Sequence, residues 1–155
     1  MPNDINNFLS PADVLIDVDA RCKRGLLSLM ADHAAGRLEI DRSALFDALM
    51  EREQLGTTAI GHGIAIPHAK VDIEKLWGVF ARTKTPIDFD ALDDRPVDLM
   101  FLLLAPVQAS ADHLKALSRI ARLVRSEEMQ NAMRGASDAK SLYSLAIGEL
   151  DAAAA

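Results

Sequence analysis

The stretch VDLMFLLL at residues 97–104 decides the fold class, because seven of its eight residues are apolar. A continuous apolar run of this length is typical of a strand that is buried on both faces. Residues 14–18 and 77–83 also indicate strands. Residues 85–90 alternate polar and apolar side chains, and could form a short edge strand or an extended loop.

Helices are expected between and after these strands. Residues 22–35 carry apolar side chains at helical spacing, and Gly36 is expected to end this helix in a left-handed conformation. Four more helices are predicted from residues that commonly cap helix N-termini: Asp41, Ser110, Ser126 and Ser137. Because strands alternate with helices and at least one strand is buried on both faces, we expect a layered α/β domain.

The length and composition are those of one globular domain. The chain has 155 residues, of which 50% are hydrophobic and 26% are charged, which is enough apolar material for one core. We place the domain at residues 1–150, and we expect the alanine-rich tail at residues 151–155 to fray.

Several classes of function are disfavoured by the charge pattern and the apolar runs. There are 23 acidic and 17 basic residues, so a nucleic-acid partner is not expected. The longest apolar run, residues 99–107, is about half the length of a membrane-spanning helix, so no membrane insertion is expected. The N-terminus does not resemble a signal peptide, and Cys22 is the single cysteine, so we expect a cytoplasmic protein.

A rigid histidine follows a glycine-rich segment at residues 56–70, GTTAIGHGIAIPHAK. Pro67 fixes its own φ and favours an extended residue before it, so His68 is presented in a repeatable direction at the end of a strand. The segment before it could bring N–H and hydroxyl groups to an anion, as phosphate-binding loops do; its candidate residues are Thr57, Thr58, Gly61 and Gly63. On this evidence alone, a glycine-rich turn beside a surface histidine is equally consistent.

Two further residues complete a possible site for phosphoryl transfer. His113 lies in the first turn of a predicted helix that follows a buried strand, and α/β proteins tend to place their sites at such strand ends. Arg52 lies near the end of the second predicted helix, on its apolar face. A nucleophilic histidine, a second histidine and an arginine can attack a phosphoryl group and stabilise its oxygens. The alternatives are a structural helix-end histidine and a surface arginine with a buried stem.

The segment at residues 56–70 resembles the active-site signature of the IIA proteins of the fructose/mannitol class in the bacterial phosphotransferase system. The likeness is greatest to the nitrogen-regulatory branch, enzyme IIA-Ntr. It extends through residues 51–53, 86–90, 96–99 and 112–114, and covers nearly the whole chain. The resemblance implies a three-layer α/β/α domain with a mixed sheet. It also implies that His68 accepts the phosphoryl group, with His113 beside it and Arg52 supplying positive charge.

Two residues depart from the pattern of the family. His62 stands where related proteins often have asparagine, and Ala69 where they often have glycine, which puts the backbone after His68 in doubt because alanine resists positive φ. A metal site made of His62, His68 and His113 is not expected, because a His-x5-His spacing is not a usual chelating pair. His62 is expected to be exposed on a loop.

We therefore expect a phosphoryl carrier and regulator rather than a turnover enzyme. The resemblance implies that a histidine phosphocarrier similar to HPr, the NPr of this branch, donates the phosphoryl group. No cofactor or metal is expected, because Arg52, His113 and loop N–H groups can neutralise the transferring oxygens. Phosphorylation would then control target proteins such as transporters or sensor kinases. The alternatives are a sugar-specific IIA that passes phosphate to a IIB domain, and a binding module that is never phosphorylated.

Overall fold

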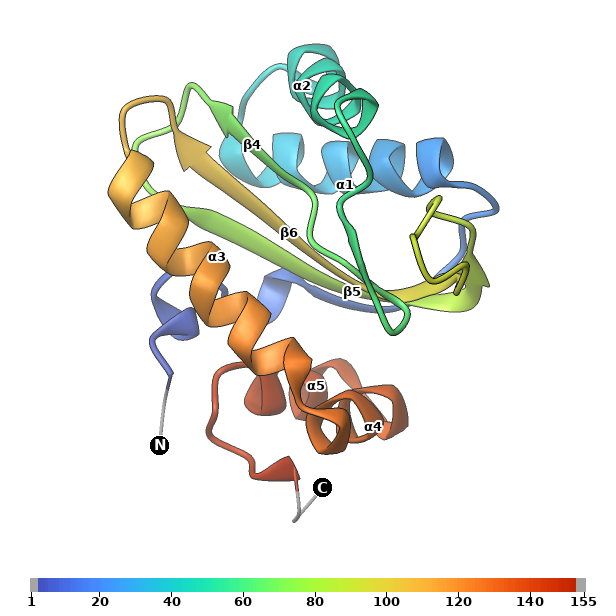
Figure 1. The fold of residues 1–155 in the computed structure, drawn as a ribbon. Coiled ribbons are helices and arrows are strands. Elements are labelled where there is room, and N and C mark those ends of the chain that lie inside the picture. The colour runs from blue at the N-terminus through green and yellow to red at the C-terminus, as the bar shows by residue number, and fades with distance from the viewer. Residues whose placement is uncertain (1–2, 153–155) are drawn as a thin grey trace.

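A six-stranded mixed sheet forms the middle layer of the structure, a computed structural model that describes residues 3–152 (Figure 1). The strand order is β1-β5-β6-β3-β2, and β4 pairs with β6 beyond the end of β3. The strands are β1 (Val14–Val18), β2 (Ala59–Gly61), β3 (Ile64–Ala65), β4 (His68–Val71), β5 (Trp77–Ile87) and β6 (Val97–Pro106). Residues 153–155 of the predicted tail lie outside the described residues, and the domain limit at residue 150 stays a prediction.

The central strand is β6, and its burial confirms the expectation for residues 97–104. Its residues are buried except for the half-buried Asp98 and Pro106. It runs antiparallel to β5 on one side, and parallel to β3 and β4 on the other. Residues 85–90 do not form the separate short edge strand that was one alternative, because β5 continues to Ile87 and pairs it with Val97; the strand ends there.

Helices cover both faces of the sheet, which confirms the three-layer α/β/α fold (Figure 1). One apolar core lies between the sheet and the helices α1 (Lys23–Leu38) and α2 (Arg42–Gln54). A second core lies beneath α3 (Ser110–Arg125), α4 (Glu127–Gly135) and α5 (Ala139–Ala146). Two short 3₁₀ helices, η1 (Ile5–Asn7) and η2 (Pro11–Asp13), precede the sheet. The buried strands read as continuous apolar runs because both of their faces are covered.

Two of the four predicted N-caps are confirmed. The side chain of Asp41 accepts a hydrogen bond from Ala44 N at 3.1 Å, and that of Ser126 accepts one from Met129 N at 3.2 Å. The prediction for Ser110 is wrong, because this residue is already helical and Ala109 precedes it. The prediction for Ser137 is wrong by one residue, because the neighbouring carboxylate of Asp138 accepts from Ser141 N at 2.8 Å and caps α5.

The predicted limits of the first helix are also wrong. Gly36 does not end α1, which continues to Leu38 and is followed by Glu39 with φ 56°. The apolar side chains of Leu38 and Ile40 pack against the core beneath α1 and α2, and this packing extends the helix past the glycine. At the other end Cys22 is the N-cap rather than a helical residue, since its Sγ accepts from the backbone N of Gly25 at 3.3 Å.

A proline divides the chain that lies along β6 into two short strands. Ile64 pairs with Leu99 in β3, and His68 pairs with Leu103 in β4, so the chain keeps one direction along β6. Between the two strands Pro67 has no N–H to donate, but its carbonyl accepts from Leu103 N at 2.9 Å. His68 therefore begins a strand instead of ending one, which corrects the sequence-based expectation.

Candidate functional site

The strand β4 presents His68 and Lys70 on one of its faces. Side chains alternate along a strand, and here the intervening Ala69 is buried, whereas His68 is half-buried and Lys70 is exposed. The rigid Pro67 and the pairing with β6 fix the direction of the His68 ring. The site is therefore built on a sheet strand and not on a mobile loop.

The hydrogen bonds of His68 define which of its nitrogens is nucleophilic. Its Nδ1 lies 2.9 Å from the carbonyl oxygen of Ile66, and its Nε2 lies 3.2 Å from Nε of Arg52. A carbonyl oxygen can only accept and an arginine N–H can only donate, so Nδ1 carries the proton and Nε2 keeps its lone pair. The imidazole is thus held neutral, with Nε2 directed toward the guanidinium.

His113 lies against this ring. The two ring centroids are 5.5 Å apart with an interplanar angle of 70°, and His113 is only 7% exposed, in the first turn of α3. Its Nε2 is buried and has no hydrogen-bond partner. Burial lowers the pKa of His113 below its usual value, and the nearby His68 and Lys70 lower it further, so His113 is neutral at pH 7.

An open cavity of about 550 Å³ adjoins these groups. Its walls come from the end of α2, from β4 and from the start of α3. The residues that line it include Glu51, Arg52 and Leu55 at the end of α2, His68 and Lys70 in β4, and His113, Leu114 and Leu117 in α3. Two of its apolar residues are strongly exposed, Leu55 at 83% and Leu114 at 68%. A nucleophilic histidine beside an arginine that is held by hydrogen bonds, within an exposed apolar rim, is suited to receive a phosphoryl group from another protein.

Comparison with known proteins identifies the family. The family model described as "Phosphoenolpyruvate-dependent sugar phosphotransferase system, EIIA 2" matches residues 7–147. The chain belongs to this EIIA type-2 family. A "Nitrogen regulatory protein" of Bradyrhizobium diazoefficiens is 46% identical over 142 residues, which cover 91% of this chain and 93% of the relative. A "PTS system fructose-specific EIIA component" of Haloferax volcanii is 42% identical over 133 residues, which cover 84% of this chain and 86% of the relative.

A solved structure supports the same assignment. The crystal structure of nitrogen regulatory protein IIA-Ntr from Neisseria meningitidis superposes with a TM-score of 0.88 at 29% identity, covering 92% of this chain and 98% of that one. The resemblance to the nitrogen-regulatory branch is thereby confirmed. Within residues 3–152 of this EIIA type-2 protein, no helix has the length and apolar character needed to span a membrane.

Arg52 and His113 contact His68, whereas the predicted phosphate-binding loop has other partners. The hydroxyl of Thr57 donates to Phe89 O at 2.6 Å, and the hydroxyl of Thr58 donates to the carboxylate of Glu53. None of the four predicted loop residues lines the cavity beside His68. Their role in binding phosphate stays a prediction, whereas their contacts in the EIIA structure hold the loop to its neighbours.

The glycines of this segment shape the turn between β2 and β3. His62 has φ 58° and Gly63 has φ 78°, so both central residues of the turn are left-handed, as in a type I′ hairpin. Asparagine and histidine are both enriched in left-handed conformations among non-glycine residues. This explains why His62 can stand where related proteins often have asparagine. A Cβ at Gly63 would lie 2.6 Å from Nη2 of Arg134 and 3.3 Å from Pro96 O, so the turn requires glycine there.

The two departures from the family pattern leave the reacting groups in place. Ala69 lies within β4 and does not take a positive φ, so the alanine creates no backbone strain after His68. His62 is exposed on the turn, as predicted, and its backbone N donates to Asp93 at 2.9 Å. In the part of the chain that the structure describes, no three His, Cys, Asp or Glu side chains are grouped to hold a metal ion.

Two residues at or near the site were not predicted. Lys70 lines the cavity, and the two-residue period of a strand, applied from His68 onward, could have identified it. Glu53 is a buried carboxylate next to Arg52 in sequence, and its contacts depend on α1 and on the loop after α2. No spacing rule in the sequence identifies it.

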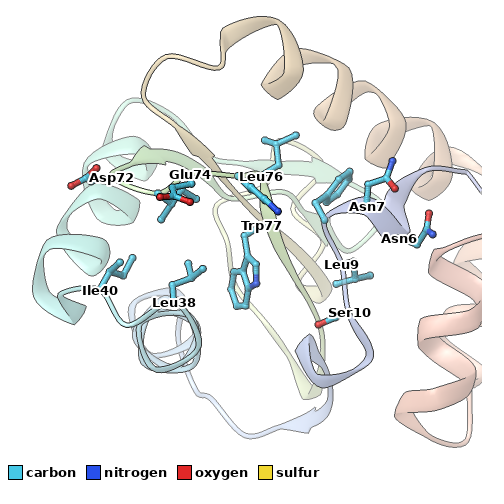
Figure 2. Close-up of a pocket in the computed structure, with 13 residues that line it drawn as sticks. Asn6, Asn7, Leu9, Ser10, Leu38, Ile40, Asp72, Glu74, Leu76 and Trp77 are labelled. Atoms are coloured by element: carbon cyan, nitrogen blue, oxygen red, sulfur yellow. The ribbon is translucent and has the colours of Figure 1, made fainter.

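A second cavity of about 560 Å³ is lined in part by the loop that follows β4 (Figure 2). The indole of Trp77 lies between Leu38 and Ser10 in this view, and the carboxylates of Asp72 and Glu74 lie at one side. None of the groups that surround His68 lines this cavity. It is therefore separate from the candidate site of the EIIA protein.

The low pKa of His113 predicts a pH dependence of stability. An unfolded histidine titrates near 6.5, whereas folding lowers the pKa of His113, so the unfolded chain binds a proton first as the pH falls. The contribution of His113 to the free energy of unfolding should be constant above pH 6.5 and should decrease below it. Urea unfolding between about pH 8 and pH 5 should show a smaller decrease for His113→Leu than for the wild type. Equal pH profiles would contradict the lowered pKa.

Proposed function

We propose that the protein is a phosphoryl carrier and regulator of a nitrogen phosphotransferase system. Nε2 of His68 accepts a phosphoryl group from an HPr-like phosphocarrier, the NPr of this system. The phosphorylated and unphosphorylated forms then bind target proteins differently, with transporters and sensor kinases as the expected classes of target. We expect this exchange to take place in the cytoplasm.

The observation that carries the proposal is the neutral ring of His68, with its Nδ1 proton on Ile66 O and its Nε2 lone pair facing the open cavity with Arg52. In the transfer, this lone pair forms a bond to phosphorus while the N–P bond of the donor phosphohistidine breaks, and the donor nitrogen keeps the electron pair. The His68 ring gains positive charge because Nδ1 keeps its proton. The Ile66 carbonyl stabilises that charge through the existing hydrogen bond.

Arg52 and His113 supply the donors for the phosphoryl oxygens. The Nε–H of Arg52 occupies the lone pair of His68 at 3.2 Å, so the guanidinium must shift aside as phosphorus approaches. It then remains within reach of the transferring oxygens, to which a guanidinium can donate two parallel bonds. The unpartnered Nε2 of His113 is a second group that gains a partner when the phosphoryl group arrives.

The output of the proposed switch is a change of charge at the apolar rim formed by Leu55 and Leu114. Phosphorylation adds close to two negative charges at neutral pH. A target that covers His68 with an apolar surface would have to bury this charge without a partner, which is unfavourable. Such a target should bind the unphosphorylated protein more tightly.

A second candidate is a sugar-specific IIA that passes its phosphate to a IIB domain, and the likeness to a fructose-specific EIIA component favours it. The chemistry at His68 would be the same, but the phosphate would have an onward acceptor. The two functions therefore differ only in what happens after His68 is phosphorylated.

Stepwise reconstitution tests the proposal. We expect the protein to become phosphorylated when it is incubated with the general phosphotransferase proteins, the HPr-like donor and phosphoenolpyruvate. Fructose- and mannitol-class IIB proteins are then added, and the rate of dephosphorylation is measured. Slow loss of phosphate supports the regulator, whereas rapid transfer to IIB supports the sugar-specific IIA. Failure to accept any phosphate would reject both and leave a binding module.

A further inference from the structure

The last turn of α2 carries a buried carboxylate, Glu53, which accepts hydrogen bonds from α1 and from the loop after α2. Glu53 is 7% exposed, and its Oε2 accepts from Nζ of Lys23 at 2.9 Å. Both of its oxygens lie 3.2 Å from the backbone N of Thr58, and one accepts from the Thr58 hydroxyl. A buried charge is unfavourable unless it is paired and hydrogen-bonded, and Glu53 meets both conditions.

The contacts of Glu53 close the loop that follows α2. The chain leaves the helix after residue 54 and returns to Glu53 at Thr58, which is itself only 5% exposed. Lys23 ties the same carboxylate to α1, and it also pairs with Asp90 at 3.0 Å. Burial by itself would lower the pKa of Lys23, but the bonds to the two carboxylates outweigh it and raise the pKa. The loop is thus held from one side by an ionic contact and from the other by Thr58.

This closed loop supports the guanidinium of Arg52. Gly56 lies in the loop, and its carbonyl oxygen accepts from Nη1 of Arg52 at 2.9 Å. The Nε of the same guanidinium donates to Nε2 of His68. Arg52 is therefore held at two points, of which one is the reacting histidine and the other is a carbonyl whose place depends on the loop.

We propose that Glu53 is a positioning residue for phosphoryl transfer, which holds the loop at Gly56 so that Arg52 is directed at Nε2 of His68. The inference rests on the proposed function of His68, and it adds a residue that does not contact the phosphoryl group. Glu53 acts through Arg52, so its effect on transfer requires the guanidinium to be present.

Glutamine is the informative replacement because it keeps the shape of the side chain. A carboxylate can accept all the bonds that Lys23 and Thr58 donate to it, whereas an amide has one accepting oxygen and an NH₂ group that only donates. In Glu53→Gln that NH₂ group must face either Lys23 or the donors of Thr58. The loop at Gly56 then loses part of its anchor.

The first measurement is spectroscopic and needs no phosphate. In ¹⁵N-labelled protein, the bond between Nε of Arg52 and Nε2 of His68 should produce a scalar coupling between the two nitrogens. This coupling should be lost or strongly reduced in Glu53→Gln. It should persist in Asp47→Asn, which removes an exposed carboxylate from the same helix. Persistence of the full coupling in Glu53→Gln overturns the proposal.

The second measurement is a double-mutant cycle on the rate of phosphoryl acceptance. At saturating donor, Glu53→Gln should slow acceptance about 10²-fold, the effect of misplacing a reacting group by about 1 Å, with little change in the donor KM. In an Arg52→Ala background the same change should slow acceptance no further. Additive effects of the two substitutions would show that Glu53 acts on the rate independently of Arg52, and would overturn the proposal.

Two outcomes need separate treatment. If Glu53→Gln does not fold, Thr58→Val replaces it, since this variant keeps the ion pair and removes only the hydroxyl bond. Thr58→Val should weaken the coupling between Arg52 and His68 in the same way. An unchanged coupling in this variant contradicts the proposal. If the wild type accepts no phosphate, the proposed function fails, but the coupling measurement still decides whether Glu53 directs Arg52 at His68.

Discussion

His68→Ala should accept no phosphate. Intact-mass analysis of the wild type after incubation with the phosphotransferase proteins should show one acid-labile phosphoryl addition, and this addition should be missing from the variant. In the proposed function the nucleophile is Nε2 of His68, a residue that lines the cavity, and alanine has none. The expected effect is complete because the guanidinium of Arg52 has no lone pair with which to attack phosphorus, and Nε2 of His113 is buried.

A matched control is available in the exposed histidine of the β2–β3 turn. His62→Ala removes an imidazole from the same segment of chain without touching the cavity, and it should keep the full phosphoryl addition. Persistence of the addition in His68→Ala, or its loss in His62→Ala, would assign the phosphate to another residue. Either result would reject the site as described.

Arg52→Ala and His113→Ala should accept phosphate about 10²–10³ times more slowly than the wild type. Each substitution removes one group that can donate a hydrogen bond to the transferring oxygens, and neither removes the nucleophile. Rapid-quench measurement of acceptance from a phosphorylated HPr-like donor would give the rates. Arg52→Lys should recover only part of the loss, because an ammonium keeps the charge but not the two-point geometry of the guanidinium.

The control for these two variants is Arg125→Ala, which removes an exposed cation at the last residue of α3, away from the cavity. Circular dichroism should show that all of the variants are folded. Near-normal rates for both Arg52→Ala and His113→Ala would make these residues structural. A loss of rate in Arg125→Ala of the same size would indicate a general effect of net charge instead.

Local rules predicted the parts of the fold and site that depend on local chemistry. The buried strand β6 followed from its unbroken apolar run, and the caps Asp41 and Ser126 followed from side chains that compete for the first backbone N–H groups. His68 was selected as a candidate because Pro67 stiffens the chain before it. His113 was selected as a candidate because its helix follows a buried strand. Both inferences depended on neighbours within a few residues.

The features that were missed depend on contacts between distant segments. Gly36 has a strong tendency to end helices, but packing of the following apolar residues against the core overrode it. The role of Thr57 and Thr58 in binding an anion stays a prediction, but the partners of their hydroxyls, a carbonyl in the 87–90 region and the carboxylate of Glu53, were not foreseen. Such partners are known only when the layers of the fold have been assembled.

The N-terminal segment of the described chain contacts the segment that ends α5, and this contact determines where another domain could be attached. Asn3 donates from its backbone N to Ile147 O at 3.1 Å and from its side chain to Ala146 O at 2.9 Å, so the N-terminal segment is fastened to the end of α5. Both ends lie on the side of the molecule remote from α2 and β4 (Figure 1). A polypeptide joined to either end would therefore leave His68 uncovered. The same unit could work as a free-standing carrier or as one segment of a larger transporter without rebuilding its site.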